Sequence, residues 1–173
     1  MVKRGRPSKD DKDLPVLVDM AQRWVNSCRK SSVYSLAQPH AKARYLADID
    51  VKTDPHRAKG KLLKNGIKST SKRLQRKFIK LRDRDEGTIL RIGAYLEMAR
   101  IRWRVLQQDR GPVTGPFSNR WLDDPGFVRA QDKAVKTLAL TLSITTDDAR
   151  GLADEGLMIL RKWFPEKYSD FLI

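Results

Sequence analysis

The sequence has few of the residues that form covalent cross-links or metal sites. Its 173 residues include a single cysteine, Cys28, which excludes an intrachain disulfide. The two histidines, His40 and His56, have no partners at the spacing of a zinc site. The chain also lacks a Gly-rich phosphate loop and a nucleophile with an evident base. We therefore expect neither an enzyme nor a protein with a metal or other cofactor.

Long apolar runs are missing as well. The longest uncharged apolar stretch, residues 138–144, is far shorter than a membrane-spanning helix. No apolar run follows the basic N-terminus, so a signal peptide is not expected. These absences predict a soluble, cytoplasmic protein without a membrane partner, associated with the nucleoid if the source is prokaryotic.

Positive charge is abundant and unevenly placed. The chain has 36 Lys and Arg against 21 Asp and Glu, a net charge of +15. Residues 1–110 carry 28 of these cations and 12 of the acids, whereas residues 111–173 carry 8 and 9. An excess of this size points first to nucleic acid as the partner. The predicted basic function therefore belongs to the first two thirds of the chain.

The densest basic stretch runs from Lys68 to Arg84. Leu74, Phe78 and Leu81 recur at helical spacing, and cations fill most of the remaining positions. This pattern predicts a cationic amphipathic helix over about residues 70–83, capped by a hydroxyl residue at its start. Such a helix is favourable beside phosphates, because each neutralised phosphate releases condensed counterions. A solvated helix face is the simpler alternative.

The N-terminus carries the motif Arg4-Gly5-Arg6-Pro7, which resembles the core of an AT-hook. This resemblance implies minor-groove binding, in which Gly5 lets the backbone approach the groove and Arg4 and Arg6 enter it. The following Ser8 extends the motif into one that also resembles the lead-in arms of bacterial helix-turn-helix proteins. Both resemblances imply DNA as the partner.

The predicted fold is all-α in three parts. Residues 1–13 form a flexible basic arm, and residues 14–110 form a basic helical DNA-binding domain. Residues 111–173, beyond the Gly-Pro breakers at 111–116, form a smaller, near-neutral helical region for protein contacts.

Two elements of the second part are central to the prediction. A helix over 55–64, a break at residues 65–67 and the basic helix from about 70 suggest a helix-turn-helix-like unit. A long central helix is expected over 89–108, apolar on more than one side, as in a buried helix or a dimer interface.

A second helix-turn-helix spacing occurs in the third part, with Ser143 at the usual glycine position. Its second helix would present Asp147, Asp148, Asp154 and Glu155, which would repel phosphates. We interpret this unit as a helical corner that packs or binds protein.

These patterns favour a double-stranded DNA-binding protein, such as a transcriptional regulator or a phage or plasmid DNA-handling factor, and a homodimer would fit symmetric half-sites. The basic helix would enter the major groove and the arm the minor groove. The alternatives are a module that binds an acidic protein and an RNA-binding protein. The predicted DNA contacts are Arg4, Gly5, Arg6, Ser69, Thr70, Lys72, Arg73, Arg76, Lys77, Lys80 and Arg82.

Overall fold

The computed structural model describes residues 9–49, 54–111 and 121–171, and within these ranges the chain forms helices and no strand. The helices are α1 (Lys9–Asn26), α2 (Val33–Ala47), the short 3₁₀ helix η1 (Pro55–Ala58), α3 (Gly60–Arg84), α4 (Glu86–Arg110), α5 (Pro125–Leu142), α6 (Thr146–Trp163) and α7 (Pro165–Tyr168). The predicted all-α fold is confirmed, and so is the long central helix, which is α4. No helix in these ranges is both long and apolar enough to cross a membrane.

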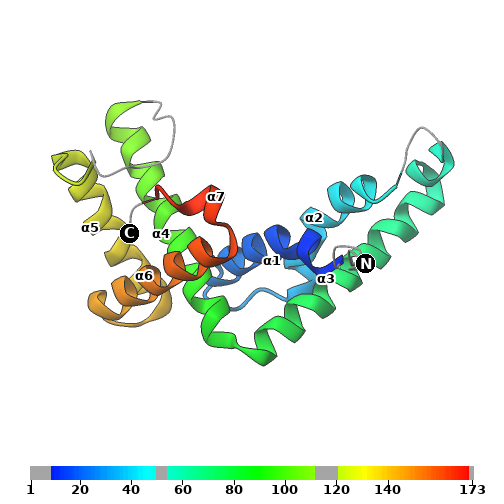
Figure 1. Ribbon diagram of the computed structural model, residues 1–173, viewed down its shortest axis with the longest axis horizontal. Helices are drawn as coiled ribbons and strands as arrows, with labels where there is room; N and C mark the ends of the chain where they lie inside the picture. The colour runs from blue at the N-terminus through cyan, green and yellow to red at the C-terminus, as the bar shows by residue number, and fades with distance from the viewer. Residues whose placement is uncertain (1–8, 50–53, 112–120, 172–173) are drawn as a thin grey trace, which may run out of the picture.

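The two longest helices, α3 and α4, meet at Asp85 and diverge from there. Figure 1 shows that α2 lies along the N-terminal part of α3 at one end of the molecule. At the other end, α5, α6 and α7 gather on α4, and α1 lies between the two groups. The N-terminal part of α3 therefore extends away from the bulk of the protein, with α2 and η1 as its neighbours.

One hydrophobic core joins the helices that precede residue 111 to those that follow it. Met20 on α1, Phe78 on α3 and Tyr95 on α4 belong to it, as do Leu138 on α5 and Leu157 on α6, and all five are fully buried. Trp24 on α1 packs edge-to-face on Phe78 of α3, with ring centroids 6.4 Å apart. This shared core fixes the direction in which α3 leaves the body of the protein.

The break predicted at residues 65–67 is wrong, because α3 is one continuous helix through Asn65, Gly66 and Ile67. Gly66 does not end the helix but makes room for the ring of Tyr45 on α2, which a β-carbon at position 66 would overlap. Two helices joined by a turn are therefore not found over 55–83, and the helix-turn-helix-like unit predicted there is incorrect. The basic helix expected over about 70–83 is the C-terminal part of α3.

One further boundary differs from the prediction. Helix α1 begins at Lys9, so the last residues of the predicted flexible arm are helical. Helix α2 continues through Pro39, although a proline inside a helix removes one of its hydrogen-bond donors.

The helical corner predicted around Ser143 is present between α5 and α6. Ser143 adopts a left-handed conformation with φ 57° and ψ 47°, which explains why the position is usually glycine. The Thr145 hydroxyl then caps α6 by accepting a hydrogen bond from the Asp148 amide at 3.1 Å. The carboxylates of Asp147, Asp148 and Glu155 are exposed on α6, as expected, whereas Asp154 is half-buried.

Candidate nucleic-acid interface

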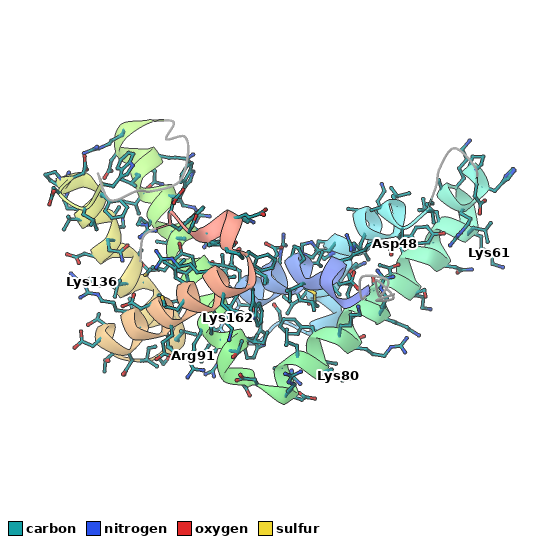
Figure 2. All side chains as sticks on the ribbon, in the orientation of Figure 1. Asp48, Lys61, Lys80, Arg91, Lys136 and Lys162 are labelled. Carbon is teal, nitrogen blue, oxygen red and sulfur yellow. The ribbon has the colours of Figure 1, made fainter. Side chains whose placement is uncertain are left out.

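Helix α3 carries a row of exposed cations at intervals of four residues: Lys64, Lys68, Lys72, Arg76 and Lys80. We call these five residues the cationic stripe. At 1.5 Å and 100° per residue, they span about 24 Å along α3 and about 160° around it. Lys61, also exposed, extends the row toward the N-terminus of α3, and Figure 2 shows Lys61 and Lys80 near the two ends of the helix.

Carboxylates are absent from the chain between Gly60 and Arg82, so no residue within this length of α3 offsets the charge of the stripe. Among the described residues, none of the stripe side chains forms an ion pair. Each pair of like charges four residues apart destabilises a helix by about 0.2–0.5 kcal/mol. The four neighbouring pairs of the stripe therefore cost about 1–2 kcal/mol in the free protein, which a bound polyanion would offset.

The opposite side of α3 holds the helix in place. Leu74 and Phe78 are fully buried there, and Thr70 and Ser71 are buried beside them. This apolar face gives α3 its direction, and the cations left on the outer face are the stripe.

A buried carboxylate adds a second connection between α3 and its neighbours. Asp13 on α1 accepts hydrogen bonds from Arg44 Nε at 3.0 Å, Arg73 Nη2 at 3.3 Å and Lys77 Nζ at 2.8 Å. Its side chain is only 3% exposed. Burial by itself would raise the pKa of Asp13, but the hydrogen bonds from Lys77 and Arg44 and the charges of Arg73 and Lys77 outweigh it, so the pKa is lowered. Asp13 thus joins α1, α2 and α3 as an ionised group.

The structure separates the predicted DNA contacts of α3 into two groups. Lys72, Arg76 and Lys80 are exposed and belong to the stripe. Arg73 and Lys77 point instead to Asp13, and Arg73 also pairs with Asp48 at 2.9 Å.

The remaining predicted contacts are divided in the same way. Ser69 is exposed, Thr70 is buried, and Arg82 pairs with the adjacent Asp83 at 3.0 Å. The predicted hydroxyl cap is not found, because Ser69, Thr70 and Ser71 lie inside α3. Arg4, Gly5 and Arg6 lie outside the described residues.

The sequence interpretation missed Lys61, Lys64 and Lys68 as interface candidates. The signal that identifies the last two is the four-residue spacing, which runs unbroken from Lys64 to Lys80. The predicted end of a helix at Asn65 and Gly66 placed Lys64 and Lys68 on different elements, so this spacing was not recognised.

In the part of the chain that the structure describes, neither a metal site nor an aromatic surface accompanies the stripe. Within the described ranges, no group of three or more His, Cys, Asp or Glu could hold a metal ion. Tyr34 is the one aromatic among the exposed large hydrophobic residues there, and it lies on α2. Single-stranded nucleic acids are commonly bound by stacking their bases on several aromatic rings, so this surface offers charge without a stacking platform.

Comparison with known proteins gave no match: no family model, no curated protein and no solved structure is significantly similar to the chain. The geometry and charge of α3 are therefore the basis for a functional proposal.

Proposed function

We propose that this protein binds double-stranded DNA through the cationic stripe of α3, with contacts mainly to phosphates. The observation that carries the proposal is the stripe itself: five exposed cations without ion-pair partners among the described residues, in a row along a helix that extends from the body of the protein. Each phosphate that such a cation neutralises releases counterions, which favours binding.

The residue types favour phosphate contacts over base reading. Four of the five stripe residues are lysines, whose ammonium groups act as point charges. Specific reading of guanine relies mostly on the two-pronged guanidinium of arginine, and the stripe has one arginine, Arg76. We therefore expect weak sequence preference from α3, and any sequence preference would come from other parts of the chain, such as the motif at Arg4–Arg6.

The proposal can be tested by changing all five stripe residues to Gln and measuring affinity for a 30-base-pair duplex over a range of salt concentrations. The matched control changes five exposed cations elsewhere, Lys30, Arg104, Lys133, Lys136 and Lys162, to Gln. Both variants lose the same charge and the same numbers of Lys and Arg. We expect the stripe variant to lose duplex binding and the control variant to keep most of it.

Equal losses in the two variants would overturn the proposal, because the effect would then follow net charge rather than the stripe. Competition with polyglutamate distinguishes an acidic protein partner. A stripe that binds polyglutamate as tightly as the duplex, with an equally steep dependence on salt, would favour the protein-interaction alternative.

A further inference from the structure

A polar cavity of about 450 Å³ lies where α1, α2, η1 and α3 meet. Its ionisable lining consists of four cations and two carboxylates: Lys12, Arg44, Arg57, Arg73, Asp13 and Asp48. Figure 2 shows Asp48 at the end of α2, beside α3. The lining has an excess of two positive charges, and its volume is within the range of small-molecule sites.

The two carboxylates of the cavity are already occupied. Asp13 accepts hydrogen bonds from three cations, and Asp48 pairs with Arg73 Nη1 at 2.9 Å. Neither carboxylate is therefore available to neutralise Lys12 or Arg57, the other two cations of the lining. The excess positive charge of the lining is therefore carried by Lys12 and Arg57, and Arg57 has an ion-pair partner outside the lining, Asp54 at 3.7 Å.

These two cations have little to bind within the described residues. Lys12 is exposed and forms no ion pair there. Arg57 approaches Asp54 only to 3.7 Å and lies over the Tyr45 ring at 5.9 Å. In addition, the Nε atom of Arg73 is buried and has no hydrogen-bond acceptor. A buried charged donor without an acceptor is destabilising, and a bound anion would supply the acceptor.

A second hollow of about 430 Å³ adjoins the cavity and shares Asp48, Arg57 and Arg73 with it. Its lining includes Asn65 and Ser69, which supply uncharged hydrogen-bond donors. The two hollows thus share the cationic donors of Arg57 and Arg73, and the second hollow adds neutral polar groups. A phosphate ester with an attached sugar has the charge and the polar groups to match both hollows.

The geometry points to a binding site for a phosphate group in the cavity formed by Lys12, Arg44, Arg57 and Arg73. A phosphate monoester carries up to two negative charges and several acceptor oxygens, which match the excess charge and the unsatisfied donors of the lining. A carboxylate would offset only one of the two charges. The site would bind phosphate whether or not α3 binds a duplex.

The phosphate has two sources to be distinguished. Arg73 follows Lys72 directly and lies about 60° around α3 from Arg76, so the cavity borders the stripe and could receive a backbone phosphate of a bound duplex. A free phosphate ester would use the same donors.

The test is ³¹P NMR titration of the full chain with inorganic phosphate at constant ionic strength, with chloride as the balancing salt. The double variant Lys12→Gln, Arg57→Gln removes the two cations that Asp13 does not bind. The control, Arg29→Gln with Lys30→Gln, removes two exposed cations from the turn after α1. We expect saturable binding by the wild type, at least tenfold weaker binding by the double variant, and no change in the control. The proposed site would be refuted if the wild type showed no saturable phosphate binding, or if the wild type and the double variant bound phosphate with equal affinity.

Competition then identifies the source. If phosphate at constant ionic strength displaces the 30-base-pair duplex from the wild type but not from the double variant, the cavity holds a backbone phosphate. If phosphate binds without displacing the duplex, the ligand is a small phosphate ester. The five-residue stripe variant keeps all four cavity cations and should still bind phosphate. Loss of duplex binding by the stripe variant therefore tests the proposed function separately from the cavity.

Discussion

The ring of Tyr45 on α2 lies directly on the backbone of Gly66, so that α2 and α3 approach closely there. Gly66 is inside α3, where glycine is otherwise unfavourable. The Tyr45 hydroxyl also donates a hydrogen bond to the carbonyl oxygen of Arg57 at 3.2 Å, which fixes η1 to α2. One tyrosine therefore positions both the N-terminal part of the cationic stripe and η1, whose Arg57 lines the polar cavity. The glycine is needed for packing, not for a turn.

Replacing Gly66 with Ala should lower the free energy of unfolding by about 2 kcal/mol, because the new methyl group overlaps the Tyr45 ring. The matched control is Gly151→Ala on α6, where the glycine is exposed and nothing lies within 4 Å of the added carbon. That change should raise stability by up to about 1 kcal/mol through helix propensity. Urea denaturation of both variants checks the pair. A Gly66→Ala variant that gains as much as Gly151→Ala would show that α2 and α3 do not approach closely.

Asp13→Asn should destabilise the protein by about 3 kcal/mol at neutral pH, because it leaves three cations around a buried site without their anion. Asp132→Asn is the control, since Asp132 is exposed and its partner Arg150 is 3.9 Å away; its effect should stay within about 0.5 kcal/mol. Thermal or urea unfolding at pH 7 measures both changes. Similar small losses in the two variants would contradict the role of Asp13.

The same carboxylate should make stability depend on pH in a defined direction. The folded pKa of Asp13 is below its ordinary value of 3.8, so its stabilisation is complete well above pH 3.8 and is lost as the pH falls through the folded pKa. Between pH 5 and pH 2, the wild type should therefore lose more stability than the Asp13→Asn variant. Parallel pH profiles for the two proteins would mean that other groups cause the acid sensitivity.

The helices were largely predictable because their apolar residues recur at helical spacing. The long helix α4 and the basic C-terminal part of α3 could be predicted in this way. The continuity of α3 could not be predicted, because Asn65 and Gly66 favour a turn by local propensity. The reason for a glycine inside the helix is its contact with the ring of Tyr45, which lies more than 15 residues earlier in the chain.

For the candidate interface, the sequence identified the right helix but could not say which cations are free to bind a ligand. Arg73 and Lys77 are as basic as Lys72 and Arg76, yet they pair with Asp13, which lies about 60 residues away in the chain. A charge pattern defines helix faces, but the partner of each face depends on tertiary packing. The polar cavity was missed for the same reason, because its four cations come from α1, α2, η1 and α3.

Arg102 on α4 should be one of the strongest single contributors to stability among the arginines. It is fully buried, donates a hydrogen bond from Nη1 to Gln131 Oε1 at 2.6 Å, and lies 4.9 Å from the ring centroid of Phe127 on α5. Arg102→Ala removes these contacts and leaves a cavity, so we expect a loss of about 3 kcal/mol. Arg104→Ala, two residues further along the same helix, affects an exposed side chain and should change stability by less than about 0.5 kcal/mol. Guanidinium denaturation compares the two, and equal losses would contradict the packing of α5 on α4 through Arg102.

Lys72 and Lys77 separate the two roles that basic residues have on α3. Lys72 belongs to the cationic stripe, whereas Lys77 donates to Asp13 at 2.8 Å. Lys72→Gln should raise stability slightly, by up to about 1 kcal/mol, because it removes two like-charge pairs of the stripe. It should also reduce the slope of log affinity against log salt concentration by about 0.9 for a duplex, the value of one phosphate contact. Lys77→Gln should lower the free energy of unfolding and leave that slope unchanged in the folded protein. Fluorescence anisotropy with a labelled duplex measures the slopes, and urea denaturation measures the stabilities. Because both changes remove one charge from the same helix within five residues, an identical loss of slope would show that the duplex responds to the total charge of α3 and not to the exposed stripe.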